Sequence, residues 1–185
     1  LIEAGADVNA IDDNGNTPLH DAVTFPDAGG DIKALLNAGA DANYKNNDGN
    51  TPLHRGARSG SAASNLKLLV EAGADLNIKN NDGETPLDIS MKKGKPENFK
   101  AILDSGLSTG ADVFKPKIDG NTLLHLAARS NRSRNTQITL HLLKAGAAVV
   151  AKNNNAQTPL HVASTYIAAK NIRYLIKFDA DVDAQ

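Results

Sequence analysis

The sequence predicts an all-α solenoid, a stack of short repeats in which each repeat contributes two helices. A motif that opens with threonine recurs five times, at Thr17, Thr51, Thr85, Thr122 and Thr158. A second motif, of the type Ala-Gly-Ala-Asp, keeps the same phase and spans residues 3–9, 37–43, 71–77 and, more loosely, 144–150. The threonines are 34, 34, 37 and 36 residues apart, and periods of roughly 20 to 50 residues are typical of solenoids.

The residues after each threonine predict the first helix of a repeat. Thr17 can cap a helix by accepting a backbone N–H, and Pro18 stands at the first helical position, where a missing N–H costs nothing. Leu19 then points inward. Small residues such as Ala22 and Ala163 follow, and they let neighbouring helices approach closely in a stack.

Apolar residues and a terminal glycine predict the second helix. Ile32, Leu35 and Leu36 recur at helical spacing. Glycine supplies the left-handed helix end, and it is expected to do so at Gly39, Gly73, Gly106 and Gly146. Asn-Gly and Asp-Gly pairs provide the positive φ of a tight turn, at Gly15, Gly49, Gly83 and Gly120.

The motif Thr-Pro-Leu-His, at Thr17–His20, Thr51–His54 and Thr158–His161, resembles the T-P-L-H-x-A core of the ankyrin repeat, whose period is about 33. The resemblance implies an all-α ankyrin-repeat solenoid of stacked helix-turn-helix units with projecting β-hairpin-like finger loops. It also implies a single domain over residues 1–185. The expected parts are the end of a preceding repeat at 1–12, repeats at 13–46, 47–80, 81–117 and 118–153, and a final repeat at 154–185.

Several positions depart from the family pattern. The third repeat has Asp88 where the others have histidine, and the fourth has Leu123 in place of proline. The third repeat also gains four residues within 105–110, which we expect to form a loop after its second helix. The fifth repeat has Ala156 in its finger turn and Asp179 at its helix end, so its geometry is expected to be the least regular. Because the chain starts without methionine, we expect a fragment whose repeats continue.

Composition and motifs argue against several functional classes. The 20 basic and 21 acidic residues leave a formal net charge of -1, which gives no general attraction to nucleic acid. The chain has no cysteine for redox chemistry, and no apolar run approaches the roughly 20 residues that cross a bilayer. No nucleotide-binding, zinc-protease or hydrolase motif occurs. We therefore expect no enzyme, cofactor, metal or small-molecule substrate, and a cytoplasmic location.

The histidines are expected to be structural. Four of the five occupy one equivalent position near the start of each first helix, so neighbours lie roughly 10 Å apart, too far to share a zinc ion. Each imidazole is expected to bridge backbone groups of adjacent loops. Asp12 and Asp13 are paired acids, but on an exposed finger they lack the enclosed pocket that tunes a general acid.

The resemblance implies that a concave groove between the fingers and the first helices binds another protein. The finger positions are Asp13, Asn14, Asn16, Asn47, Asp48, Asn50, Asn81, Asp82, Glu84, Ile118, Asp119, Asn121, Asn154, Asn155 and Gln157. The positions at the ends of the first helices are Thr24, Phe25, Arg58, Ser59, Lys92, Lys93, Arg129, Ser130, Thr165 and Tyr166. Any one of them could equally be an ordinary solvated residue, so the prediction rests on the repeated pattern.

The charges expected in the groove indicate the sign of the charge on the partner. Arg58, Lys92 and Arg129 occupy the same position in three consecutive repeats, which predicts a basic stripe that selects an acidic docking segment. The partner is then a protein, with no nucleic acid and no membrane involved, and the chain is expected to be monomeric. An ordinary solvated face is the competing explanation for this stripe.

Two further hypotheses concern context and modification. The chain is alternatively a regulatory or targeting segment of a larger enzyme or channel, a secreted bacterial effector acting in a host cytosol, or a purely structural spacer. Asn9, Asn43 and Asn77 each lie two residues after an aspartate and resemble the sites that asparaginyl hydroxylases modify in ankyrin-like repeats. The alternative is that these side chains hydrogen-bond their own turn.

Overall fold

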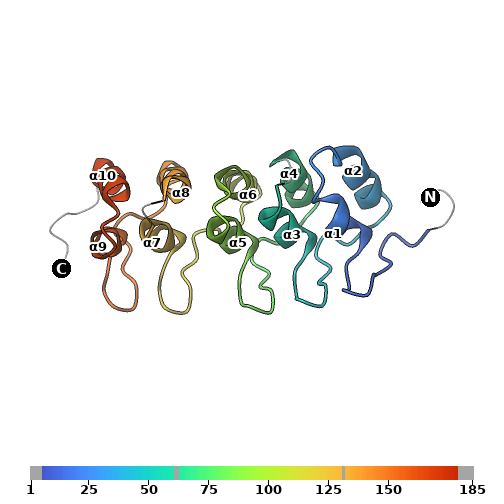
Figure 1. Ribbon diagram of the computed structural model, residues 1–185, viewed down its shortest axis with the longest axis horizontal. Helices are drawn as coiled ribbons and strands as arrows, with labels where there is room; N and C mark the ends of the chain where they lie inside the picture. Colours follow the sequence, from blue (N-terminus) through green and yellow to red (C-terminus); the bar gives the residue numbers. More distant parts are fainter. Residues whose placement is uncertain (1–5, 61–62, 131, 179–185) are drawn as a thin grey trace. The chain divides into compact units, whose positions relative to one another are not determined.

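The computed structural model describes residues 6–60, 63–130 and 132–178, and all regular structure within them is helical (Figure 1). The chain divides into two compact units, Leu1–Val113 and Phe114–Gln185, which are described separately below. The predicted all-α repeat solenoid is confirmed. The single domain and the repeat boundaries stay a prediction.

The first unit holds its described helices as three successive pairs. The pairs are α1 (Pro18–Ala22) with α2 (Gly29–Asn37), α3 (Pro52–Arg58) with α4 (Ala63–Glu71), and α5 (Pro86–Lys92) with α6 (Pro96–Ser108). The first helices α1, α3 and α5 pack in one row, and the second helices α2, α4 and α6 pack in another (Figure 1). The loops before the first helices project away from the second helices as fingers.

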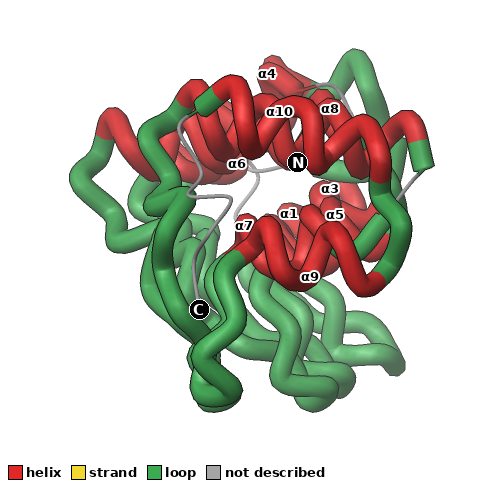
Figure 2. Tube along the Cα trace, turned by 90° about the vertical axis from the view of Figure 1, so that its left-hand side faces the viewer, coloured by secondary structure: helices red, strands yellow, loops and turns green. Residues whose placement is uncertain are grey.

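The second unit repeats this plan with α7 (Leu123–Ala128), α8 (Ser133–Lys144), α9 (Pro159–Thr165) and α10 (Ala169–Lys177). α7 packs on α9, and α8 packs on α10. Figure 2 shows the loop before α9 leaving from the side of α9 that faces away from α10. The finger side and the second-helix side are therefore opposite faces of the unit.

The core lies between the two helix rows of each unit. In the first unit, Leu19 and Leu53 from the first helices and Ile32, Leu66 and Phe99 from the second helices are completely buried. Burying one such side chain contributes about 1.5–3 kcal/mol. Since helices this short are not stable alone, stacking of the repeats has to supply most of the stability.

Threonine and proline begin the first helices as predicted. Thr17, Thr51 and Thr85 are N-cap residues with extended backbone, and proline follows each of them. Thr122 has the same role although Leu123 follows it, because leucine is a good helix former and proline is not required at the first helical position.

The expected loop over residues 105–110 is wrong, because α6 continues to Ser108 and the left-handed glycine is Gly110, with φ 76°. Gly106 lies inside the helix and is buried. A Cβ atom at Gly106 would collide with the side chains of Leu76 and Val113. This glycine therefore permits close helix packing instead of ending the helix, and the inserted residues extend α6.

The fifth repeat carries backbone strain. Ala156 has φ 58° in the finger turn, where Gly15, Gly49 and Gly120 have φ between 73° and 75°. Ile167 has φ 52°, a conformation that is costly for a β-branched residue. Asp179, the other departure expected in this repeat, lies outside the described residues.

Ala156→Gly is expected to stabilise the protein by about 1 kcal/mol, because glycine adopts positive φ without the steric penalty of a Cβ atom. Urea unfolding followed by circular dichroism measures the change. Ala151→Gly is the matched control outside the positive-φ region, and it should give no gain. Equal effects of the two substitutions would contradict strain at Ala156.

Candidate functional site

In the fingers that begin at Asp12, Asn46, Asn80 and Asn153, a side chain at the base closes the loop. Asn46 Oδ1 accepts hydrogen bonds from the backbone N–H groups of Asp48 (3.1 Å) and Asn50 (2.9 Å). Asp12 does the same for Asn14 (2.9 Å) and Asn16 (2.7 Å). A hydrogen bond from the Asn16 side-chain amide to Asp12 Oδ2 (3.0 Å), together with these backbone bonds, lowers the pKa of the Asp12 carboxyl. The finger loops are thus held in one shape by their own sequence.

Asparagine side chains also join each finger to the next within a unit. Asn46 Nδ2 donates to Asn16 Oδ1 (2.8 Å), and Asn80 Nδ2 donates to Asn50 Oδ1 (3.0 Å). Asn16 and Asn50 are only 6% and 8% exposed. Both side chains are therefore largely buried in the ladder of hydrogen bonds between fingers. Asn50 still borders the hollow described below, and contact of either residue with a partner stays a prediction.

Histidines tie the first helices to the fingers that follow them. His20 Nε2 lies 2.9 Å from the carbonyl oxygen of Asn50, and the backbone N–H of Thr17 donates to His20 Nδ1 (3.1 Å). His54 repeats the arrangement with Glu84, at 3.0 Å. Because a carbonyl only accepts, Nε2 carries the proton and the ring is neutral. The predicted bridging role is confirmed.

His125 makes the same tie in the second unit, where its Nε2 lies 2.8 Å from the carbonyl oxygen of Gln157. Burial lowers the pKa of His20, His54 and His125 below the ordinary value.

At Asp88, which replaces the histidine of the third repeat, Oδ2 accepts from the backbone N–H (3.0 Å) and hydroxyl (2.9 Å) of Thr85. Aspartate thus preserves the cap of its own repeat.

A polar hollow of about 250 Å³ lies in the first unit, between a finger and the ends of α1 and α3. Its walls are Thr24, Asn46, Asp48, Asn50, His54, Arg55, Arg58 and Ser59. Arg55 is held by Asp21, at 3.0 Å. Arg58 is exposed and makes no ion pair with any described residue, so its guanidinium is available to a ligand.

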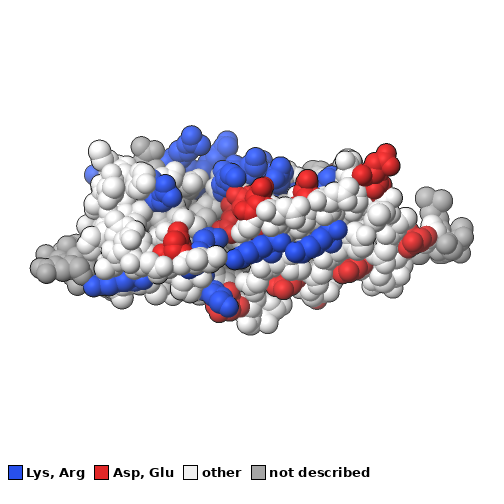
Figure 3. All heavy atoms as spheres, turned by 90° about the horizontal axis from the view of Figure 1, so that it is seen from below, with Lys and Arg blue, Asp and Glu red and all other residues white. Residues whose placement is uncertain are grey.

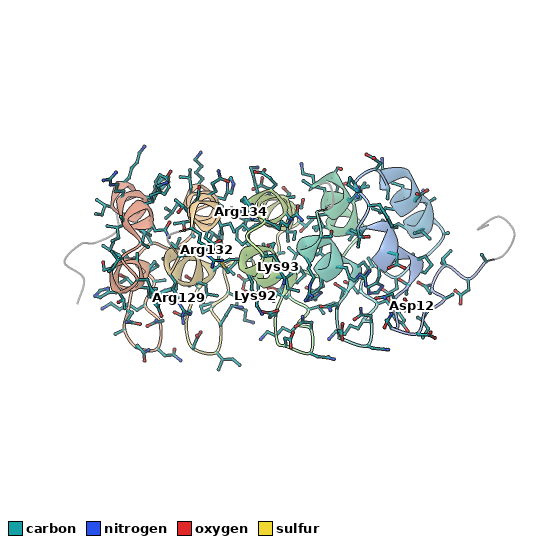
Figure 4. All side chains as sticks on the ribbon, viewed as in Figure 1. Asp12, Lys92, Lys93, Arg129, Arg132 and Arg134 are labelled. Atoms are coloured by element: carbon teal, nitrogen blue, oxygen red, sulfur yellow. The ribbon has the colours of Figure 1, made fainter. Side chains whose placement is uncertain are left out.

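The other expected groove cations have neighbours of their own. Lys92 Nζ pairs with Glu84 Oε1 at 2.9 Å, and this contact raises the pKa of Lys92. Arg129 lies 4.9 Å from the centre of the Tyr166 ring and donates to its hydroxyl at 3.1 Å. Figure 4 labels Lys92 and Lys93 on the first unit and Arg129 on the second. The stripe across both units stays a prediction.

Most of the other expected contact residues are exposed. These are Asp13, Asn14, Phe25, Asn47, Asp48, Asn81, Asp82, Lys93, Ile118, Asp119, Asn154, Asn155, Thr165 and Tyr166. The remaining ones are partly exposed, namely Thr24, Ser59, Glu84, Asn121, Ser130 and Gln157. Figure 3, which views the finger side, shows separate acidic patches along the first unit. The surface therefore combines acidic fingers with basic helix ends.

The small net charge of the whole chain is the sum of an acidic first unit and a basic second unit, a difference that sequence analysis missed. Residues 1–113 carry 10 basic and 17 acidic residues, a formal charge of −7, whereas residues 114–185 carry 10 and 4, a formal charge of +6. No Asp or Glu occurs between Gly120 and Phe178. Counting charge in windows along the chain, instead of summing it, would have revealed this division.

Comparisons with known proteins agree with this geometry. The family model of ankyrin repeats in three copies matches residues 28–116 and 107–185, so the chain belongs to the ankyrin-repeat family. Ankyrin repeats are generally protein–protein interaction modules, a fold without enzymatic chemistry of its own. No curated protein matches the chain in a sequence search.

Among solved structures, the chain is similar to the ankyrin repeat domain of Bcl-3, described as a unique member of the IkappaB protein family. The TM-score is 0.79 at 26% identity, over 99% of this chain and 78% of that one. Within the part of the chain that the structure describes, no helix is long and apolar enough to span a membrane, and no three His, Cys, Asp or Glu side chains gather as a metal site would require.

Proposed function

We propose that the concave groove of the first unit binds a segment of another protein, and that Arg58 pairs with a carboxylate of that segment. The observation that carries the proposal is the polar hollow beside Arg58, whose charge has no ion-pair partner among the described residues. A guanidinium can hold a carboxylate through two parallel hydrogen bonds.

The surrounding groups support a rigid, directional site. Asp48 contributes an acidic wall from the finger, while Arg55 and Arg58 contribute basic groups from α3. The finger is fixed by hydrogen bonds to its neighbours, so little ordering entropy is lost when a partner binds. A partner segment with an acidic residue toward α3 and a basic residue toward the finger fits this arrangement. Phe25 is 62% exposed at the end of the first repeat's helix, and an exposed aromatic suits an interface anchor.

Reversing the groove charges is expected to slow association with the partner. The partner is captured by pull-down with the wild-type chain and then used in stopped-flow or surface-binding measurements. Arg58→Glu with Lys92→Glu should lower the association rate about ten-fold at low salt, and less at high salt, because screening removes the steering.

The matched control is Lys33→Glu with Lys67→Glu, which changes net charge equally on the exposed side of α2 and α4. This control should leave the association rate within about two-fold of the wild type. An unchanged rate in the groove variant, with the helical circular dichroism signal intact, would rule out the groove as the docking surface.

The candidate hydroxylation sites differ in how firmly their side chains are held. Asn43 Nδ2 donates to the carbonyl oxygen of Gly73 (3.1 Å), and Asn43 Oδ1 accepts from the backbone N–H of Asp75 (2.8 Å). Asn9 bonds to the next repeat in the same way. These side chains lock one repeat to the next instead of bonding only within their own turn. The Asn77 side-chain amide makes no hydrogen bond to a described residue, although its backbone N–H bonds to Asp75.

We therefore expect an asparaginyl hydroxylase to modify Asn77 before Asn43 and Asn9, because less structure has to open around Asn77. Incubation with such an enzyme, followed by peptide mass spectrometry over time, should show a gain of one oxygen first in the Asn77 peptide. Asn77→Ala provides the assignment control. Faster modification of Asn43, or no modification at all, would contradict the proposal.

A further inference from the structure

We propose that the second-helix side of the second unit binds an acidic segment of a partner protein, at a site distinct from the groove. This surface, the α8/α10 face, consists of Ser133, Gln137, Lys170, Arg173 and Tyr174 together with the buried Thr136. The helices that carry it, α8 and α10, lie on the side of the unit away from the finger that precedes α9 (Figure 2). The proposal does not rest on the function proposed for the groove.

The second helices of the second unit carry positive charge only, whereas those of the first unit carry both signs. α8 and α10 contain basic residues and no acid, at Arg134, Lys144, Lys170, Arg173 and Lys177. The second helices of the first unit mix both signs, as Lys67 and Glu71 do in α4, and Lys100 pairs with Asp104 in α6. The cations of α8 and α10 make no ion pair with any described residue. Among the described residues, no carboxylate therefore lies within ion-pair distance of these cations.

The α8/α10 face also contains a hollow. A row of cations that only contacts solvent does not require one. A hollow of about 360 Å³ opens between α8 and α10. Lys170 and Arg173 lie on one wall, and Ser133 and Gln137 on the other. Thr136 is buried and its hydroxyl is already bonded to the carbonyl oxygen of Arg132, at 3.2 Å.

These groups match the chemistry of a carboxylate-bearing chain. The planar guanidinium of Arg173 and the ammonium of Lys170 are charge-assisted donors to a carboxylate. The exposed hydroxyl of Ser133 and amide of Gln137 can bond the backbone of a bound segment. Tyr174, half-buried beside them, offers an apolar surface to the methylene groups of a glutamate side chain.

The same lining favours a peptide over other polyanions. Single-stranded nucleic acid binds by stacking bases on exposed aromatic rings, and Tyr174 is the one aromatic residue of this lining and is half-buried. Insertion into a membrane surface needs apolar side chains that enter the bilayer, whereas the walls of this hollow are polar or charged.

The test measures binding of a fluorescein-labelled octaglutamate peptide to the full chain by fluorescence anisotropy at low and at high salt. Lys170→Glu with Arg173→Glu is expected to weaken binding at least ten-fold at low salt, since attraction becomes repulsion at the centre of the hollow. Lys33→Glu with Lys67→Glu, an equal change in net charge on α2 and α4, should weaken it by no more than about two-fold.

Three outcomes would overturn the proposal. The first is that the wild type does not bind octaglutamate. The second is that both double variants lose the same amount of affinity, which would mean attraction by net charge alone. The third is tighter binding of an oligothymidylate, or of vesicles containing phosphatidylserine, with the same dependence on Lys170 and Arg173. Thermal unfolding followed by circular dichroism confirms that each variant is folded, and Lys170→Gln with Arg173→Gln serves as a milder pair if the reversal does not fold.

Discussion

Acidification from about pH 7 to about pH 5 is expected to lower the free energy of unfolding, because His20, His54 and His125 are held neutral in the folded protein. Each ring accepts a hydrogen bond at Nδ1 from the backbone N–H of its own threonine cap. A proton at Nδ1 would turn this acceptor into a donor and break the cap.

The free energy of unfolding falls on acidification because burial lowers the pKa of these histidines. The unfolded chain binds more protons than the folded chain once the pH falls below the unfolded pKa of about 6.5. The stabilisation is therefore complete above about pH 6.5 and is lost as the pH falls toward the folded pKa.

Urea unfolding at a series of pH values measures this loss, and His54→Gln should reduce the pH dependence by about one proton. His54→Ala should also cost about 2–4 kcal/mol at neutral pH, since it leaves the Thr51 N–H and the Glu84 carbonyl without their partner. His161→Gln is the control, because its described bonds involve only Thr158. A free energy of unfolding that does not change with pH would contradict the assigned ring protonation.

Asn171→Asp is expected to destabilise the second unit by about 3 kcal/mol or more. Asn171 is completely buried, and its Nδ2 donates to the carbonyl oxygens of Ala127 (3.2 Å), Ala128 (3.2 Å) and Ser130 (2.6 Å). Ala127 and Ala128 end α7 and Ser130 follows it, so these carbonyls lie where the helix no longer supplies a full set of N–H partners. A carboxylate at position 171 would place negative charge against three acceptors.

Hydrogen exchange resolves this effect, because amides of α9 and α10 should lose protection more than those of α3 and α4. Asn155→Asp, on an exposed finger position, introduces the same charge and should change stability by less than about 0.5 kcal/mol. Equal losses of stability from Asn155→Asp and Asn171→Asp would show that the buried Asn171 amide does not hold α10 against the end of α7.

The sequence predicts the first helices well because their signals are local. A threonine cap, a proline at the next position and a histidine three residues after the cap act within one helical turn, and the structure places Thr17 and His20 accordingly. The repeat period then extends the same inference to the other units. Even the contact between His20 and the next finger was predictable, since only a neighbouring loop lies within reach of the ring.

Features that depend on packing were not predictable in this way. Asn65, Asn98 and Asn171 lie 14, 13 and 13 residues after the threonine of their repeat. All three bind carbonyls at or just after the end of a first helix, but this spacing alone does not show which carbonyls they reach. Gly106 and Gly110 were both suitable helix ends, and the choice depends on Leu76 and Val113. Asn16 and Asn50 resemble the exposed finger asparagines in sequence, although the ladder buries them.

The central claim is that the partner docks on the finger side of the first unit, and amide hydrogen exchange of the full chain with and without the captured partner tests it most directly. Binding is expected to slow exchange in the finger at residues 46–50 and at the end of α3, residues 55–59, which border the hollow. The second helices α4 and α6 should exchange as they do in the free protein. Slowed exchange confined to α4 and α6, with the fingers unchanged, would contradict the account.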